Sequence, residues 1–333
     1  MPVKSAPDTV TAAIQSILHQ TLRTFELIVI CNQCDSETKS RVLQVSDARL
    51  VVIEYNHLAS VALALNAGLA LARGQFIARM DADDVSCPER LELQAAALSK
   101  NESIQLVSGL VRFESRLADA RGFKRYVDWQ NSLLGASEIY ANRYVESPLV
   151  HPSIMMRSEC LRQLCGWQEG GFPEDYDLWL RFFAAGHRAV RLPVTVLVWN
   201  DHQDRLTRVD SRYLQTAFTR IKMQHLIKEL QARQIGTGLD CRSLVFWGAG
   251  RYARRIIRLL QDAGFQIEAL LEVHPGRIGQ RIHGIPVVTP GHIQQDRNSF
   301  VLSGVPGIIA RTEIEDYLHA SGRQAVRDYY CLA

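Results

Sequence analysis

The sequence predicts an α/β protein of two domains. The chain has 333 residues, of which 47% are hydrophobic and 22% charged, so it is long enough to bury two cores. Strand-like and helix-like segments alternate from the start, and the alternation resumes after residue 240. Such alternation is typical of a mixed, mainly parallel sheet covered by helices.

The first 208 residues are predicted to form the larger domain. Its expected elements are a helix at 9–20, strands at 25–30 and 50–55, a helix at 59–72, a strand at 75–80, a helix at 88–98, a helix at 173–186 and a strand at 192–199. The segment 107–150 mixes polar and aromatic residues with Gly and Pro, so we expect an irregular binding wall or lid there.

The rest of the chain is predicted to be a connector and a smaller domain. A long amphipathic helix at 211–233 and a linker at 234–241 connect the domains over residues 209–240. The second α/β unit, 241–333, opens with a strand, a Gly-rich turn and a helix. Further strands are expected at 267–273, 285–288 and 299–305.

Composition excludes several classes of protein. A net charge of +3 gives no chain-wide basic signal for nucleic acid. The most apolar window, 58–72, is shorter than the roughly 20 residues that span a bilayer. No apolar signal segment opens the chain and the seven cysteines are unevenly spread, so we expect a cytoplasmic protein. Cys31 and Cys34 form a CxxC without a second metal-spaced pair, which disfavours zinc.

Three carboxylates follow the predicted strand 75–80. Asp81, Asp83 and Asp84 would lie at the carboxyl end of that strand, where α/β sheets bind ligands. Paired carboxylates there can hold a divalent cation that in turn holds a diphosphate. The alternative is that Asp83, Asp84 or Ser86 caps the helix that follows.

A second acidic cluster opens the predicted helix 173–186. Glu174, Asp175 and Asp177 stand in its first turn, which the helix dipole favours on its own. A carboxylate that faces a cleft from this position can also serve as a general base toward a hydroxyl group. His202 follows the strand 192–199, where it is either solvated or a further metal or phosphate ligand.

Three ordered segments carry a family likeness. Residues 13–30, 65–94 and 151–182 closely resemble family 2 glycosyltransferases with the GT-A fold, and the likeness extends from residue 1 to about 205. The resemblance implies that Asp81 approaches the donor ribose and the metal, and that Asp83 binds Mg²⁺ or Mn²⁺ on the diphosphate. It implies Asp175 as the base. The other implied residues are Glu174 beside the base, His202 at the metal, and Asn32, Asn66, Arg79 and Arg90 at the donor.

Two departures from the family pattern affect this transfer. The chain starts at MPVKSAP, so we expect the family's first strand to be truncated. Cys31 and Asn32 stand where relatives have an Asp-Asp-Gly-Ser run, which leaves the nucleobase open, although a UDP-linked donor is expected. Sugar choice depends on the segment 107–150.

The second α/β unit contains a glycine pattern. Gly248 and Gly250 fit the pyrophosphate-binding turn of Rossmann-like units, with Glu272 as the expected ribose acid. The unit resembles small Rossmann-like modules that accompany nucleotide-sugar enzymes, which implies a second nucleotide site. The alternative is a tight turn in a module that serves packing or homo-oligomerisation.

The leading prediction is an inverting, metal-dependent glycosyltransferase. It would transfer a sugar from a nucleotide-diphosphate donor to a cell-surface glycan or a lipid-linked acceptor. Peripheral membrane contact would involve the helix 211–233, at the inner face of the membrane. The alternative is a non-catalytic nucleotide-sugar or dinucleotide sensor, and a nucleotidyltransferase is weaker because no glycine-rich basic loop precedes the acids.

Overall fold

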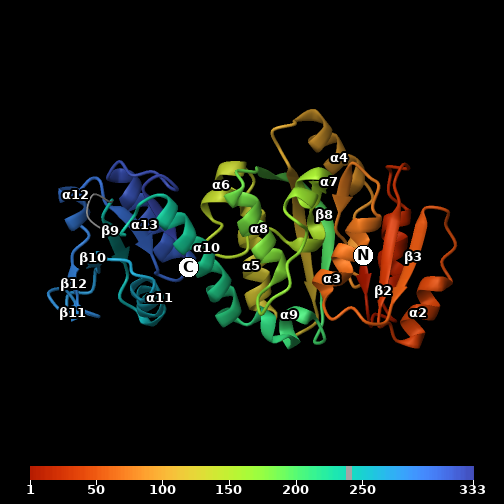
Figure 1. Cartoon of the computed structure of the whole chain (residues 1–333), viewed down its shortest axis with the longest axis horizontal. Coiled ribbons are helices and arrows are strands. Elements are labelled where there is room, and N and C mark those ends of the chain that lie inside the picture. The colour runs from red at the N-terminus through yellow and green to blue at the C-terminus, as the bar shows by residue number, and fades with distance from the viewer. Residues whose placement is uncertain (238–241) are drawn as a thin grey trace. The chain divides into compact units, whose positions relative to one another are not determined.

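The computed structural model describes residues 1–237 and 242–333 (Figure 1). The chain divides into two compact units, which are described separately. The first unit comprises Met1–Tyr140 and Pro148–Phe218, and the second comprises Ala141–Ser147 and Thr219–Ala333. The boundary predicted near residue 240 lies outside the described residues, as do the last four residues of the predicted linker.

The first unit begins with a parallel sheet of strand order β1-β2-β3. Ile30 and Cys31 of β2 pair with the two residues of β1. The helices α1 to α3 alternate with these strands; α1 and α3 were predicted from the sequence, whereas α2 was not. The elements are β1 (Pro2–Val3), α1 (Val10–Leu18), β2 (Leu27–Asn32), α2 (Ser36–Leu43), β3 (Leu50–Tyr55) and α3 (Val61–Leu71).

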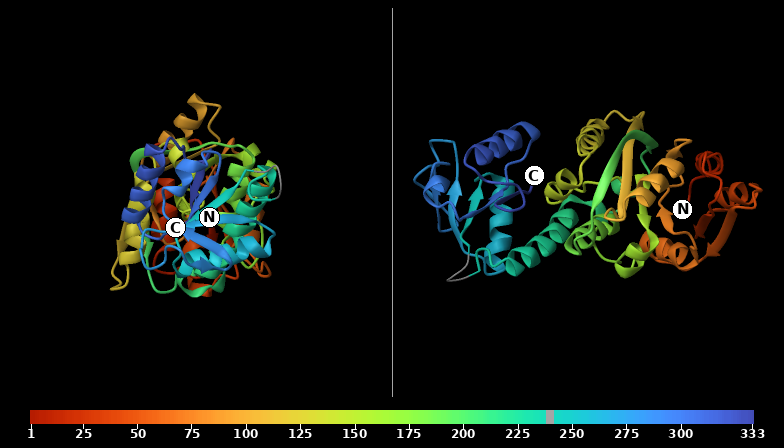
Figure 2. Two further views of the ribbon diagram at one scale, coloured as in Figure 1. Left: turned by 90° about the vertical axis from the view of Figure 1, so that its left-hand side faces the viewer. Right: turned by 90° about the horizontal axis from the view of Figure 1, so that it is seen from above.

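A second, mixed sheet of the first unit has the order β4-β7-β6-β8-β5. β6 and β8 are parallel and lie side by side along the whole of β6 (Figure 2, right). Since β4 and β5 are the two edges of this sheet, the six residues between them cross its end. Its elements are β4 (Phe76–Ala78), β5 (Val85–Ser86), α4 (Arg90–Lys100), β6 (Leu106–Ser115), β7 (Met155–Arg157), α7 (Ser158–Gln163), α8 (Glu174–Ala184), β8 (Ala189–Asp201) and α9 (Leu206–Val209).

The prediction of an irregular segment at 107–150 is wrong for most of its length. It contains most of β6, then α5 (Arg121–Ser132) and α6 (Ala136–Ala141). The polar residues that suggested a loop lie on the exposed face of α5, while Val127 and Gln130 are buried. Helix periodicity was hidden because only a narrow face of α5 is apolar.

The second unit has a largely parallel sheet of order β11-β12-β10-β9-β13-β14. The chain moves from β9 through α11 to β10 on one side, and from β13 through α13 to β14 on the other. The loops after β9 and β13 therefore flank a reversal in strand order. The elements are β9 (Leu244–Trp247), α11 (Arg251–Asp262), β10 (Ile267–Leu271), β11 (Arg281–Ile282), β12 (Ile285–Val288), α12 (His292–Gln295), β13 (Phe300–Ser303), α13 (Ile308–Ala320) and β14 (Tyr329–Cys331).

The helix predicted at 211–233 begins later than expected. A 3₁₀ turn at Ser211–Tyr213 comes first, Leu214 is extended, and α10 spans Gln215–Ala232. None of the helices in the described residues is long and apolar enough to cross a membrane.

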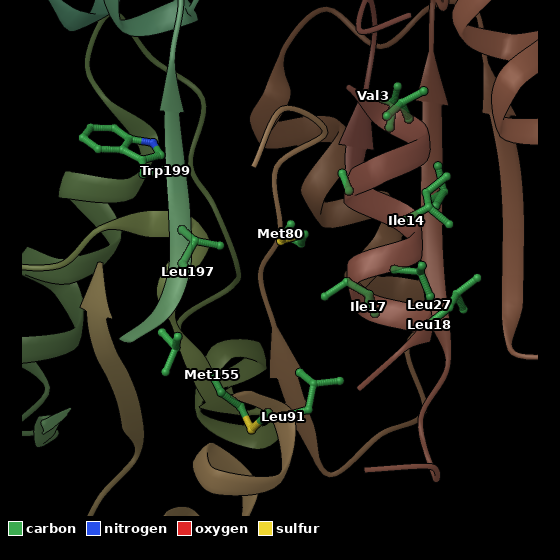
Figure 3. Close-up of a cluster of buried hydrophobic side chains, with 14 of the residues drawn as sticks. Val3, Ile14, Ile17, Leu18, Leu27, Met80, Leu91, Met155, Leu197 and Trp199 are labelled. Carbon is green, nitrogen blue, oxygen red and sulfur yellow. The ribbon is translucent and has the colours of Figure 1, made fainter. Parts of the chain in front are cut away.

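The core of the first unit holds the acidic loop in place. Met80 is 3% exposed and belongs to the hydrophobic cluster that includes Ile14, Leu91 and Leu197 (Figure 3). Because Met80 directly precedes Asp81, burial of its side chain fixes the start of the loop that carries the three carboxylates.

The contact between β6 and β8 allows no side chain at Gly109. A Cβ atom there would lie 2.7 Å from Val196 Cγ2 and 3.0 Å from Val194 O. We expect Gly109→Ala to lower the free energy of unfolding by ~1–3 kcal/mol, as overpacking does. The matched control is Gly122→Ala in the first turn of α5, where a Cβ meets nothing within 4 Å. Denaturant melts that showed equal stability for both variants would contradict this packing.

Candidate active site

The three carboxylates after β4 come together at the end of the mixed sheet. Ligand oxygens of Asp81, Asp83 and Asp84 all lie within 4.8 Å of one another. Asp84 is fully buried, and its Oδ2 has no hydrogen-bond partner among the described residues. Burial and the neighbouring carboxylates raise the pKa of Asp84 well above its usual range. An unpaired buried oxygen among like charges fits a bound cation, because hard divalent ions take oxygen ligands.

The alternative that these residues cap the next helix is wrong. α4 begins at Arg90 with Glu89 at its N-cap position and has no side-chain cap from that residue. Instead, the amide of Leu91 donates to Gln20 Oε1 (2.9 Å), and the Gln20 amide donates to Ser86 Oγ (3.2 Å). Gln20, which follows α1, therefore accepts the amide hydrogen bond at the start of α4 that was expected to go to Ser86 or an aspartate.

Residues at and just after the end of β8 contact the acidic loop. The amide of Asn200 donates to Asp84 Oδ1 (2.9 Å), and the Asn200 side chain donates to the Asp83 carbonyl (2.8 Å). His202 Nε2 lies 2.9 Å from Asp83 Oδ2. That hydrogen bond raises the pKa of His202. The structure thus brings the histidine to the carboxylate with which it was predicted to share a metal.

Arg205 is a site residue that sequence reasoning noted only as a basic neighbour. Its side chain is 8% exposed, and its guanidinium stacks 4.3 Å from the Trp199 ring centroid and donates to the Asn200 carbonyl (2.7 Å). Its nitrogens lie 3.9 Å from carboxylate oxygens of Asp81 and Asp84. A cation fixed in this way can contact a phosphate beside the acids.

Asp83 shows the balance of these effects. Burial alone would raise the pKa of the Asp83 carboxyl, but the hydrogen bond from His202 and the charge of Arg205 outweigh it, so the pKa lies below its usual value. The lowered pKa favours the ionised form of Asp83, which is the form that binds a cation.

Arg79 connects the two acidic clusters. Its side chain is 6% exposed and forms an ion pair with Asp81. Its charge also lowers the pKa values of Glu174 and Asp175 against the larger effect of burial. Both clusters therefore lie within electrostatic reach of one guanidinium in the first unit.

Glu174 is held by partners from distant segments. Its carboxylate is 4% exposed, accepts a hydrogen bond from the Tyr213 hydroxyl (2.6 Å) and lies 3.9 Å from His151 Nδ1. Trp167 Nε1 donates to His151 Nε2 (2.9 Å). Burial, with the charge of Arg79, lowers the pKa of His151 well below its usual range, so the ring is neutral. Sequence reasoning missed Tyr213 and His151, since no local pattern relates them to Glu174.

Asp175 has the properties of a candidate base. It is half-buried in the first turn of α8, and its Oδ1 accepts from the Tyr176 amide (2.7 Å). Burial and the neighbouring Glu174 raise its pKa. Asp177, by contrast, accepts from Arg181 Nε (2.7 Å) and belongs to the structure of the helix.

The remaining predicted donor residues lie in different surroundings. Asn32, at the end of β2, donates to the Leu58 carbonyl (3.0 Å), and its buried Oδ1 has no partner among the described residues. Asn66 uses both ends of its amide on the backbone of Trp167 (2.7 and 3.0 Å). Arg90 is 1% exposed and donates to the carbonyls of Arg79 (2.7 Å) and Ile154 (3.2 Å), so it supports the acidic loop from within.

In the second unit, the predicted nucleotide residues lie at the carboxyl end of the sheet. Gly248 has φ +111° and Gly250 stands at the N-cap of α11. Glu272 accepts from its own loop at the amides of Val273 (2.9 Å) and His274 (3.2 Å), and it pairs with Arg277 (2.9 Å). Its carboxylate is thus already occupied on both oxygens.

Comparison with known proteins decides the family. The sequence pattern of the family described as Glycosyl transferase family 2 matches residues 1–164. The chain is 30% identical over 221 residues to EpsE of Bacillus subtilis (strain 168), a protein named as a glycosyltransferase, covering 64% of this chain and 76% of EpsE. This chain belongs to glycosyltransferase family 2. The predicted family and enzyme class are confirmed.

Other glycosyltransferases resemble the chain over similar lengths. The amylovoran biosynthesis glycosyltransferase AmsE of Erwinia amylovora is 26% identical over 244 residues, which cover 68% of this chain and 89% of AmsE. An Escherichia coli UDP-Gal:α-D-GlcNAc-diphosphoundecaprenol β-1,3-galactosyltransferase is 30% identical over 192 residues, or 55% of this chain and 66% of that enzyme.

A solved structure supports the predicted GT-A fold class of this glycosyltransferase. Residues 1–349 of S. aureus TarS, in complex with UDP-GlcNAc, align with a TM-score of 0.51 at 15% sequence identity. The alignment covers 79% of this chain and 78% of that one. The likeness shows the fold alone.

Proposed function

We propose that this glycosyltransferase transfers a sugar from a UDP-linked donor to a hydroxyl group of a lipid-linked or cell-surface glycan, with inversion at the anomeric carbon and with bound Mg²⁺ or Mn²⁺. The observation that carries the proposal is the presence of two acidic clusters around Arg79 in the first unit. One cluster has the chemistry of a metal site and the other that of a general base. Helix capping, or a favourable charge at a helix N-terminus, would explain neither the presence of two acidic clusters nor the effect of Arg79 on both.

The donor side of the site would be built from the acidic loop and the end of β8. Asp81, Asp83 and His202 would hold the cation, which when bound neutralises charge on the leaving diphosphate. Arg205 lies beside the same carboxylates and would contact phosphate oxygens. Stacking on Trp199 fixes its guanidinium before any ligand arrives.

The acceptor side would be built from the start of α8. Asp175 would take the proton from the attacking hydroxyl, while Tyr213 and His151 hold Glu174 next to it. The pKa of a general base should lie near the working pH, and the raised pKa of Asp175 moves it in that direction. A single base opposite the leaving group implies one in-line displacement, and therefore inversion.

Names of relatives support the choice of donor and acceptor. Two E. coli relatives are described as transferring Gal or Glc from UDP to α-D-GlcNAc-diphosphoundecaprenol with β-1,3 linkage. We propose UDP and a diphospholipid acceptor on this basis. In this proposal residues 1–208 form the catalytic domain, 209–240 connect it to the C-terminal domain 241–333, and the enzyme contacts the membrane that carries its acceptor.

Removal of divalent metal should strongly lower the rate of UDP release from the donor. With a panel of UDP-sugars and an α-GlcNAc-diphospholipid, we expect UDP release to fall by at least ~10²-fold in EDTA and to return with Mn²⁺ or Mg²⁺, since loss of charge stabilisation costs several kcal/mol. Equal rates in EDTA would contradict the metal assignment. A sensor would bind UDP but release none from a donor at any metal concentration.

A further inference from the structure

The second unit contains a cleft that is strongly basic. It has a volume of about 750 Å³ and lies along α11, beginning at the Gly-rich turn after β9. Its walls include Ala249, Gly250, Leu259 and Asp262, and five arginines: Arg251, Arg254, Arg255, Arg258 and Arg277. This volume lies in the range of small-molecule sites.

The arginines occupy positions that a helix in isolation disfavours. Arg251 is the first residue of α11, where the helix dipole repels positive charge. Arg251 with Arg255, and Arg254 with Arg258, are like-charge pairs four residues apart, which lower helix stability. The opposite face packs into the unit through Ala253, Ile256, Ile257 and Leu260, but burial of that face does not require arginine on the exposed one. An anion in the cleft would reverse each of these unfavourable effects.

Most of this charge is not neutralised within the protein. The side chains of Arg251, Arg255 and Arg258 form no hydrogen bond or ion pair with any residue that the structure describes. Arg254 donates to the Ala249 carbonyl (2.9 Å), which leaves its charge uncompensated. Arg277 pairs with Glu272, which lies outside the lining. Asp262 is the one acid among the described lining residues.

The surroundings of the cleft select phosphate rather than ribose. A Cβ at Gly250 would meet nothing within 4 Å, so a ligand can approach the backbone at the N-terminus of α11. One guanidinium group can donate two parallel hydrogen bonds to two oxygens of a phosphate group. Glu272, which a dinucleotide site would use on a ribose hydroxyl, is already bound to two amides and to Arg277.

We propose that this cleft is a second ligand site, which binds an anion carrying at least two linked phosphate groups. The ligand is recognised through its diphosphate, with the arginines of α11 as the main contacts. Two sources share this chemistry: a nucleoside diphosphate and the diphosphate head group of a lipid. The inference is independent of sugar transfer in the first unit.

The test uses the full chain carrying Asp83→Asn, in EDTA, so that the metal-dependent donor site does not contribute. Calorimetry with pyrophosphate, UDP, farnesyl diphosphate and uridine should show binding of the three diphosphates and none of uridine. Arg255→Ala with Arg258→Ala should weaken diphosphate binding at least ~10-fold, in the range expected when two charge-assisted hydrogen bonds are lost. Arg297→Ala, an exposed arginine of the same unit outside the cleft, is the matched control and should bind as the parent does.

The arms of this experiment separate the sources and the alternatives. A tenfold preference for UDP or for farnesyl diphosphate identifies which source the cleft serves. Absence of diphosphate binding, or binding that the double arginine substitution leaves unchanged, overturns the proposal. Binding to phosphatidylglycerol vesicles without binding of any soluble diphosphate also overturns it, in favour of a membrane-docking surface. Failure of sugar transfer in the wild-type chain would not alter any of these readouts.

Discussion

Asp83→Asn is expected to lower the rate of sugar transfer by ~10²–10³-fold, because the cation that neutralises the leaving diphosphate would lose a charged ligand. Asp83 is the member of the triplet whose pKa is held below its usual value by His202 and Arg205. Asparagine keeps the size and one oxygen of the side chain but removes the charge. The measurement is UDP release under saturating donor and Mn²⁺.

The matched control for this substitution is Asp128→Asn. Asp128 lies on α5 in the same unit, is 59% exposed and pairs only at the surface with Lys124. An exposed pair of this kind contributes ~0.3–0.5 kcal/mol, so neither rate nor stability should change much. If Asp83→Asn and its control had the same activity, and both folded, the carboxylate triplet would not be the metal site.

Asp175→Asn is expected to lower transfer by ~10²–10⁴-fold, the usual contribution of a general base. Donor affinity should remain, since Asp175 belongs to the acceptor side.

The same substitution should change stability. Burial and the neighbouring Glu174 favour the protonated form of Asp175 in the folded protein, so its ionised form is destabilising there. The variant should therefore be more stable than wild type at pH 8, by about 1 kcal/mol or more, because asparagine carries no charge.

The sign of the pH dependence follows from the same shift. The pKa of Asp175 is raised above its ordinary value of 3.8, so its contribution to stability is complete below that value and is lost as pH rises through the raised pKa. Transfer should show the opposite trend, since the base acts only when ionised, with kcat/KM rising at higher pH than for an ordinary carboxylate. The apparent pKa belongs to the Glu174–Asp175 pair. Asp177→Asn, on the same helix, should reduce stability through loss of the Arg181 contact and leave this pH profile unshifted.

The parts of the fold predicted from sequence are those that local patterns determine. β3 at Leu50–Tyr55 has the predicted bounds because a short segment rich in Val and Ile favours a strand over a helix. The acidic loop was predicted to lie at a sheet end because carboxylates directly followed a strand. α5 was missed because its apolar face is narrow.

The parts of the site that sequence reasoning missed depend on contacts between distant segments. Arg205 and Asp84 are 121 positions apart in the chain, and Tyr213 reaches Glu174 over 39 positions. Gln20, from the end of α1, replaced the expected cap of α4 for the same reason. For Arg205, a basic residue three positions after a histidine at a strand end was the one local signal available.

The central claim is that one metal-dependent displacement inverts the donor sugar. Its most direct test is proton NMR of the product formed from an α-linked UDP-sugar and an α-GlcNAc-diphospholipid, with Mn²⁺ and again with EDTA. The expected result is a β-linked product with Mn²⁺ and none with EDTA. An α-linked product, or equal transfer in EDTA, would contradict the claim.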